Sequence, residues 1–252
     1  MIKNSELILN RDGTIFHLHL KPEQIADTII LVGDPGRAET ISAMFDQVEM
    51  TVRNREFLTS TGTYNNQRLT VLSTGIGTDN IDIVINELDA LANIDLQTRE
   101  VRSDKRSLRF VRVGTSGSLQ ADISVNSWVV SRKSIGFDGM ITFYDNREAV
   151  CDMEFEKVFR EFTGWADDLP TPYVVDASDK LLSLFSEIKF VKGTNISAPG
   201  FYGPQGRILR LPLSVPELNE KLEDFEYGDL RITNYEMESS AIYGLSRMLG
   251  HE

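Results

Sequence analysis

A short stretch, FYGPQGR (Phe201–Arg207), combines residue types that can recognise a flat ring. Phe201 offers an aromatic surface on which a planar heterocycle can stack, and Gln205 and Arg207 offer planar hydrogen-bonding groups for its edge. The same residues also suit an exposed turn, because Gly203-Pro204 interrupts both helix and strand. From these residues alone, a surface turn and a base-binding loop both remain open.

Three glycine-containing turns carry groups that can bind a small anion. In VGDPGR, Gly33 precedes a helix start and Arg37 lies one turn into that helix, while STGIG (Ser73–Gly77) precedes a second helix. RVGTSG adds Arg112 and Thr115 after an apolar run. Glycines admit close backbone approach, helix N-termini present N–H groups, and arginine is a permanently charged donor. VGDPGR alone is more typical of an ordinary turn, but the three together favour a phosphate-sized anion.

Two carboxylates occur in NYEMES (Asn234–Ser239), at the predicted start of the last helix. Carboxylates at such a place commonly cap the helix or complement its dipole, and this interpretation suits Glu236. Alternatively, a carboxylate such as Glu238 can accept hydrogen bonds from two vicinal sugar hydroxyls, with Met237 as an apolar neighbour. Both interpretations remain open at this point.

His17 and Arg55 are isolated candidates. In FHLHL, His17 and His19 are predicted to alternate along a strand and to point to opposite faces, and Arg55 in NREF suits a surface position. There is no HExxH pattern, no cluster of Cys and His, and no GxSxG. We therefore expect neither a bound metal nor serine-hydrolase chemistry.

These candidate residues lie between apolar strands and amphipathic helices that alternate along the chain. Strands are predicted within residues 28–33, 68–77, 108–118, 127–135 and 172–178. The helix after Gly77 has an apolar face formed by Ile81, Val84, Ile85, Leu88 and Leu91. The alternation predicts one α/β domain over residues 1–252, with three α/β/α layers around a mixed, largely parallel sheet. Ligands of such sheets bind at the carboxyl ends of the strands, where the glycine turns occur.

Composition limits the partners that this protein can have. The 252 residues are 41% apolar and include 26 Lys and Arg against 38 Asp and Glu, for a formal net charge of -12. This acidic balance argues against nucleic-acid binding. Cys151 is the single cysteine, so no internal disulfide can form, and no apolar stretch is long enough to span a membrane. We expect a cytoplasmic protein.

Taken together, the motifs resemble a known family. GDPGR, REF, STGIG…EL, RVGTSG, FYGPQGR and NYEMES occur in the order and approximate spacing of the nucleoside phosphorylase-I superfamily, and the set is most similar to its uridine phosphorylase branch. The resemblance runs from about His17 to the chain end. It implies reversible phosphorolysis of uridine to uracil and ribose 1-phosphate in pyrimidine salvage, with inorganic phosphate as a co-substrate and no cofactor. A purine nucleoside phosphorylase, a nucleosidase of the same superfamily and a catalytically silent nucleoside-binding protein are the alternatives.

The resemblance also implies a role for each candidate residue. It implies phosphate contacts from Gly33, Arg37, Arg112 and Thr115, with Arg55 reaching in from a neighbouring subunit. It implies ribose contacts from Glu236, Met237 and Glu238, with His17 at the 5′-hydroxyl across the same interface. It implies base contacts from Phe201, Gln205 and Arg207, and catalytic roles for Gln205, Arg207 and Arg112. Shared residues imply a homodimer, or a hexamer built as a trimer of dimers.

Three features depart from the family pattern. The helix after STGIG begins with Asp79, Asn80 and Asp82, so it is more acidic than is usual for the family. Charged residues 98–107 resemble an insertion and are predicted to form a solvated loop without chemistry. Members of the family continue beyond SRMLGHE with a further strand and helix. We therefore expect the C-terminal strand and helix of the family to be missing and a sheet edge to be exposed.

Overall fold

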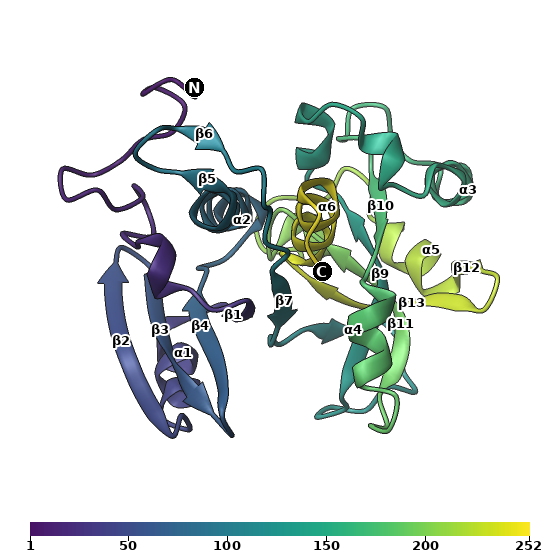
Figure 1. The fold of residues 1–252 in the computed structure, drawn as a ribbon. Helices are drawn as coiled ribbons and strands as arrows, with labels where there is room; N and C mark the ends of the chain where they lie inside the picture. The colour runs from purple at the N-terminus through teal and green to yellow at the C-terminus, as the bar shows by residue number, and fades with distance from the viewer. The chain divides into compact units, whose positions relative to one another are not determined.

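The computed structural model describes all 252 residues and divides them into two compact units. The first unit comprises Met1–Gly114 and Leu249–Glu252, and the second comprises Thr115–Met248. Figure 1 shows the course of the chain by colour. No helix is both long enough and apolar enough to cross a membrane. The assignment of residues 1–252 to one domain remains a prediction.

The first unit is built on a five-stranded sheet with the order β2-β3-β4-β1-β7. Its elements are η1 (Pro22–Gln24), β1 (Thr28–Val32), α1 (Pro35–Ser42), β2 (Gln47–Asn54), β3 (Phe57–Tyr64), β4 (Gln67–Ser73), α2 (Thr78–Asn93), β5 (Ile94–Asp95), β6 (Glu100–Val101) and β7 (Arg109–Arg112). β1 pairs in parallel with β4 and β7, and β3 pairs antiparallel with β2 and β4. The carboxyl ends of β1, β4 and β7 therefore lie at the same edge of the sheet.

The sequence pattern explains these helices. Pro35 occupies the first turn of α1, where its missing N–H costs no hydrogen bond, and the Asp34 carboxylate accepts from the backbone N–H of Arg37 at 2.9 Å. α1 packs on β3 and β4 (Figure 1). Val32 and Ala38 are buried there in an apolar cluster. All five residues of the predicted apolar face of α2 are buried.

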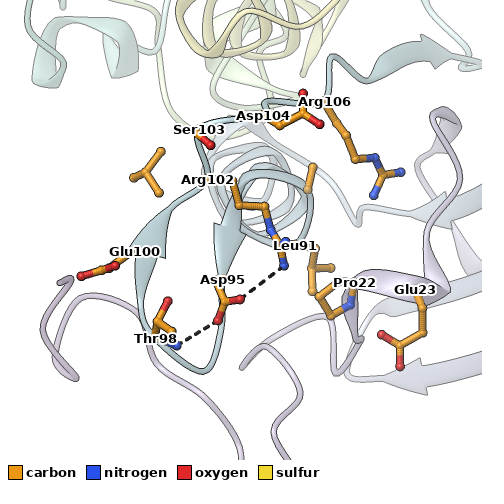
Figure 2. A pocket seen from close by; sticks show the side chains of 12 residues that line it. Pro22, Glu23, Leu91, Asp95, Thr98, Glu100, Arg102, Ser103, Asp104 and Arg106 are labelled. Atoms are coloured by element: carbon orange, nitrogen blue, oxygen red, sulfur yellow. Dashed lines mark hydrogen bonds and ion pairs between the residues drawn. The ribbon is translucent and has the colours of Figure 1, made fainter.

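Residues 98–107 are more ordered than the predicted loop. β6 pairs antiparallel with β5, so the charged segment begins as a short hairpin. The Asp95 carboxylate accepts from the backbone N–H groups of Gln97 and Thr98, each at 2.9 Å, and closes its turn. The hairpin lines an open hollow of about 650 Å³. Figure 2 shows the side chains that line it, among them the charged Arg102 and Asp95.

The chain end returns to the first unit and lies against β7. The backbone N–H of Glu252 donates to Leu108 O at 2.9 Å, and Phe110 N donates to Glu252 O at 2.8 Å. His251 is buried, and its Nδ1 accepts from Leu108 N at 3.1 Å. The last residue thus pairs with the edge of β7.

The second unit has a six-stranded sheet with the order β10-β9-β11-β13-β12, and β8 also pairs with β13. Its elements are β8 (Gly117–Ser118), β9 (Val129–Gly136), η2 (Met140–Phe143), η3 (Arg147–Ala149), α3 (Met153–Thr163), β10 (Tyr173–Asp176), α4 (Asp179–Leu184), β11 (Val191–Ser197), η4 (Gly203–Gln205), α5 (Leu218–Asp224), β12 (Glu226–Tyr227), β13 (Leu230–Glu236) and α6 (Ser239–Leu249). Parallel pairing joins β9, β11 and β13 at the centre.

An aromatic core supports this second sheet. Phe155 and Phe159 of α3 and Phe225 after α5 are buried, and the ring centroids of Phe155 and Phe225 lie 5.4 Å apart. α3 packs against both β10 and α5. This packing holds β11 and β13, whose carboxyl ends carry the NYEMES residues and their partners.

Candidate functional site

The glycine turns of the first unit come together at one sheet edge. Thr74 N donates to Val32 O at 2.8 Å, which joins the ends of β4 and β1. A Cβ on Gly33 would lie 3.9 Å from Gly75 O, so the two turns are neighbours. Gly75 has φ +75° and its Cα faces the amide of Asn80 so closely that a side chain would clash. The predicted convergence of these turns is therefore present.

Two arginines are at the same edge. Arg37 Nη1 donates to Val113 O at 3.2 Å, so the side chain reaches from α1 to the end of β7. A Cβ on Gly114 would lie 3.3 Å from Arg112 Cζ, so Gly114 leaves room for that guanidinium. Arg37 also lies 3.4 Å from the exposed carboxylate of Asp34, a surface pair worth at most about 1 kcal/mol. An anion can thus compete for Arg37.

Thr115 and Arg55 complete the predicted phosphate set. Thr115 directly follows Gly114 in the chain, is exposed, and begins the second unit. Arg55 is exposed at the turn between β2 and β3, and its Cζ lies 6.0 Å from the ring centroid of Phe16. Its φ of 55° is uncommon for a residue other than glycine, asparagine or aspartate, and such conformations are often found at functional sites.

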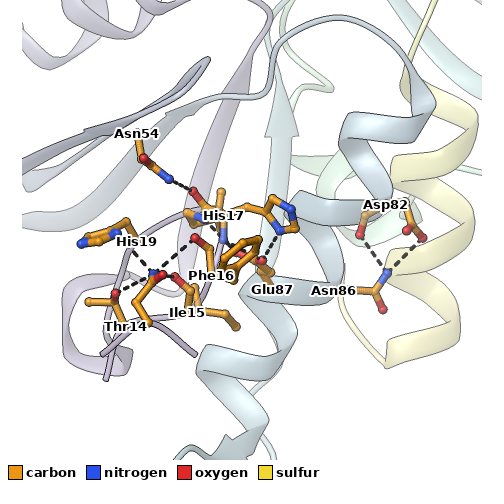
Figure 3. A network of polar contacts seen from close by, with 11 residues as sticks. Thr14, Ile15, Phe16, His17, His19, Asn54, Asp82, Asn86 and Glu87 are labelled. Carbon is orange, nitrogen blue, oxygen red and sulfur yellow. Dashed lines mark hydrogen bonds and ion pairs between the residues drawn. The ribbon is translucent and has the colours of Figure 1, made fainter. Parts of the chain in front are cut away.

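His17 lies in a turn, which corrects the prediction of an alternating strand at FHLHL. His19 has φ 57° and lies 3.0 Å from the Asp12 carboxylate, so the backbone is not extended there. His17 Nδ1 lies 2.6 Å from Oε1 of Glu87 on α2, and Asn54 donates to His17 O at 2.7 Å (Figure 3). The turn forms because these distant side chains satisfy its backbone.

In the second unit, the base-binding candidates form one cluster. Arg207 Nη1 donates to Gln205 Oε1 at 2.5 Å and to Phe201 O at 2.6 Å. Its guanidinium lies over the Phe201 ring, 4.0 Å from the centroid. Gln205 is buried, whereas 52% of Phe201 is exposed, so one ring surface is available for stacking.

A residue that sequence reasoning missed ties this loop to β13. Asn219 of α5 donates to Gln205 O at 3.3 Å and accepts from the hydroxyl of Tyr235 at 2.9 Å. Asn219 lies so close to Gly206 that a side chain there would clash, and Gly206 has φ +74°. Burial raises the pKa of the Tyr235 hydroxyl, so Tyr235 remains the neutral donor that this contact needs.

Glu236 is the last residue of β13 and not part of the last helix, which begins at Ser239. This corrects the predicted start of that helix. The Glu236 carboxylate accepts from Asn195 Nδ2 at 2.8 Å, from Ser197 Oγ, and from the backbone N–H groups of Glu238 and Ser239, each at 2.9 Å. It therefore satisfies N–H groups at the start of α6, as the capping interpretation expects.

Met237 and Glu238 connect β13 to α6. Met237 is half-buried, and Glu238 is buried with 3% of its surface exposed. The backbone carbonyl of Glu238 accepts from Ile242 N at 3.1 Å, which places Glu238 at the cap of the helix. Glu238 therefore lies between the end of β13 and the first residue of α6.

A buried polar network lies behind Glu236. Ser197 Oγ, which donates to Glu236, accepts from Ser240 N at 2.9 Å. Tyr173 donates its hydroxyl proton to the Asp138 carboxylate at 3.1 Å, and its hydroxyl oxygen lies 2.9 Å from Ser240 Oγ. Burial raises the pKa of Asp138. The network fixes Glu236 through groups that are far apart in the sequence.

Comparison with known proteins decides the family. The phosphorylase superfamily matches residues 27–252 of the chain. This chain belongs to the phosphorylase superfamily. Among members with assigned activities, a uridine phosphorylase of Thermococcus kodakarensis is 27% identical over 95% of this chain and 74% of its own length. A DeoD-type purine nucleoside phosphorylase of Listeria welshimeri is 30% identical over 93% of this chain and 81% of its own length.

Solved structures of superfamily members confirm the fold. A nucleoside phosphorylase of Trypanosoma brucei, whose structure is described as showing uridine phosphorylase activity, has a TM-score of 0.88 and 32% identity, covering 98% of this chain and 88% of that one. A uridine phosphorylase of Phytophthora capsici has a TM-score of 0.68 at 22% identity over 98% of this chain and 83% of that one. The predicted nucleoside phosphorylase-like α/β fold is therefore confirmed.

Proposed function

We propose that this superfamily member catalyses the reversible phosphorolysis of uridine to uracil and ribose 1-phosphate. The relatives in Thermococcus kodakarensis and Trypanosoma brucei, whose names or descriptions state uridine phosphorylase activity, support this reaction. The observation that carries the proposal is the hydrogen bond from Arg207 Nη1 to Gln205 Oε1. This bond orients the primary amide of Gln205.

The oriented amide matches the edge of uracil. Along that edge O4 accepts, N3–H donates and O2 accepts, so the complementary protein groups are a donor, an acceptor and a donor. Arg207 N–H, Gln205 Oε1 and Gln205 Nε2 occur in this order, since Oε1 is the amide atom bonded to Arg207. A carbonyl oxygen has two lone pairs, so Oε1 can accept from Arg207 and from N3–H together. Cytosine has an acceptor at N3 and an amino group at C4. Its N3 would face the acceptor Gln205 Oε1, and its amino group would face the donor Arg207, so neither pair could form a hydrogen bond.

The same arginine supplies transition-state stabilisation. In phosphorolysis the bond from C1′ to N1 breaks and its electron pair moves into the pyrimidine, while a phosphate oxygen forms a bond to C1′. The uracil anion then takes a proton from water or phosphate. Arg207 at O4 interacts more strongly with the anionic ring than with neutral substrate, which lowers the barrier.

Phosphate is assigned to the glycine turns of the first unit. Arg37 and Arg112 provide permanent positive charge beside Gly33, and Thr115 adds a hydroxyl. Phosphate arrives as an anion and needs no general base, so these groups act by holding it in line with C1′. We assign Arg55 to the phosphate of a neighbouring subunit, as the resemblance implies.

Ribose is assigned to the segment between β13 and α6. Glu238 supplies the carboxylate for the sugar hydroxyls, and burial strengthens such charge-assisted hydrogen bonds. Met237 packs against the sugar. The carboxylate of Glu236 already accepts from four donors, so we assign it to positioning this segment, with any sugar contact secondary. His17 of a neighbouring subunit would contact the 5′-hydroxyl.

This assignment requires at least a homodimer, and a hexamer built as a trimer of dimers satisfies it as well. We further propose a cytoplasmic enzyme of pyrimidine salvage that uses no cofactor.

One assay tests the reaction: uridine and inosine are incubated with and without inorganic phosphate, and free base and sugar phosphate are measured. Phosphate-dependent release of uracil supports the proposal, and phosphate-independent release supports a nucleosidase. Binding of uridine without turnover supports a silent binding protein.

A purine nucleoside phosphorylase is the second candidate, because the Listeria relatives carry that name. Hypoxanthine presents O6 and N1–H, which match Arg207 and Gln205 Oε1, but offers only C2–H to Gln205 Nε2. Inosine thus makes two of the three base contacts that uridine makes. A higher kcat/KM for inosine than for uridine would favour this candidate.

A further inference from the structure

We propose that Glu87 is a positioning residue that orients the imidazole of His17 toward the nucleoside 5′-hydroxyl. The inference rests on the proposed function for the identity of the group that His17 meets. It extends that function because it assigns a role to Glu87 of α2, to which the proposed function gives no substrate contact. Figure 3 shows the carboxylate of Glu87 facing the His17 ring from the helix.

Glu87 contacts both the side chain and the backbone of the turn. Its Oε1 lies 2.6 Å from His17 Nδ1 and accepts from His17 N at 3.0 Å, and its Oε2 accepts from Leu18 N at 2.8 Å. The Glu87 side chain is only 13% exposed, so solvent screens these contacts weakly. One carboxylate therefore fixes the turn and the ring together.

The carboxylate also decides which ring nitrogen faces the substrate. An ionised carboxylate only accepts hydrogen bonds, so Nδ1 of His17 must carry a proton to bond Glu87 Oε1. This holds for the neutral ring and for the imidazolium. Nε2 is then the nitrogen that serves the ligand, and in the neutral ring it is an acceptor suited to a hydroxyl. Phe16 packs against the ring at 4.7 Å between centroids.

Asn54 connects this arrangement to Arg55. Asn54 Nδ2 donates to His17 O at 2.7 Å, and Asn54 is the residue directly before Arg55 at the tip of β2 and β3. The Arg55 guanidinium lies 6.0 Å from the Phe16 ring centroid. His17 and Arg55, the two residues assigned to a neighbouring subunit's site, are therefore linked through Asn54 and Phe16. Glu87 provides the carboxylate that holds His17 in this arrangement.

The first test compares uridine with 5′-deoxyuridine, which lacks the hydroxyl. We expect Glu87→Gln to raise the KM for uridine about tenfold, with a smaller change in kcat, because an oriented hydrogen bond in binding is weakened. We expect no such change with 5′-deoxyuridine. Glu100→Gln, at an exposed position of β6, is the matched control. Equal losses with both substrates would show a general structural role and overturn the proposal.

The second test does not depend on activity. The chain has 3 histidines, so ¹⁵N-detected NMR of the wild-type protein can be assigned with the aid of His17→Gln. We expect a protonated Nδ1 in neutral His17 and a shift toward the Nε2–H tautomer in Glu87→Gln. An Nε2–H tautomer in the wild-type protein would overturn the inference. If this tautomer is as expected but no phosphorolysis occurs, the proposed function fails and the pairing of His17 with Glu87 stands.

Discussion

Arg207 and Gln205 are joined side chain to side chain, with Arg207 Nη1 donating to Gln205 Oε1 at 2.5 Å. The bond presents a donor, an acceptor and a second donor in the order that a uracil edge requires. Both partners of this bond belong to the loop itself, so the loop sets the order of the donors and the acceptor. In the proposed mechanism this contact also supports catalysis, because it holds Arg207 beside the base that becomes anionic as it leaves.

Loss of Arg207 should therefore affect turnover more than binding. We expect Arg207→Ala to lower kcat for uridine phosphorolysis about 100-fold or more, as removal of an oxyanion-stabilising donor does elsewhere. The affinity for phosphate should stay within about threefold of wild type, since Arg207 is not assigned to phosphate. Arg210→Ala, an exposed position in the same loop, is the matched control for steady-state kinetics. An unchanged kcat would remove Arg207 from the mechanism.

A shared site predicts complementation between inactive variants. A mixture of Arg55→Ala and Arg112→Ala subunits should regain activity after subunit exchange, because some sites then receive both arginines from different chains. A mixture of Arg37→Ala and Arg112→Ala should stay inactive, since we assign both residues to the site of the same subunit. Activity is measured with uridine and phosphate. Failure of the first mixture despite proven exchange would argue against a contributed Arg55.

Removal of the Glu236 carboxylate should destabilise the second unit. Glu236→Ala leaves Asn195 Nδ2, Ser197 Oγ and backbone N–H groups at the start of α6 without their acceptor. We expect the free energy of unfolding to fall by about 2–4 kcal/mol, which urea titration followed by circular dichroism can measure. Glu223→Ala, an exposed position of α5, should change it by less than about 0.5 kcal/mol. If Glu236→Ala and Glu223→Ala lowered the free energy of unfolding equally, the hydrogen bonds of Glu236 would contribute little to stability.

Cys151 should be unreactive in the folded protein. Burial, followed by the neighbouring Glu156 carboxylate, raises the pKa of the Cys151 thiol to about 12. The thiolate is the nucleophile, so labelling by a disulfide reagent at pH 8 should be slow until the protein is unfolded.

The same shift has a consequence for stability at high pH. The folded-state pKa is above that of the unfolded chain, so the folded state binds the proton more tightly. The contribution of the Cys151 thiol to the free energy of unfolding is therefore complete below the unfolded-state pKa of about 9. It is lost as the pH rises from there toward the folded-state pKa of about 12. Cys151→Ser should reduce the decline of stability over this range. Rapid labelling of the native protein at pH 8 would contradict the assignment.

Much of the fold and part of the candidate site can be predicted from local patterns. Apolar runs predict β1 and β4, and the helical spacing of apolar residues predicts α2, whose predicted face is buried. Gly33 and Gly75 are turn signals, and the parallel pairing of adjacent strands places their turns together. These features depend on the backbone preferences and the apolar spacing of a few consecutive residues, which can be read directly from the sequence.

Other features depend on residues that are distant in the sequence. The turn at His17 is held by Glu87, 70 residues away, and Glu236 is bound by Asn195, 41 residues away. The hydrogen bond from Asn219 to Gln205 likewise joins separate elements. A local pattern cannot show which remote side chain will satisfy a buried polar group, because this depends on how strands and helices pack. Periodicity and turn chemistry specify the elements, whereas only the packed chain selects among the possible roles of Glu236 and His17.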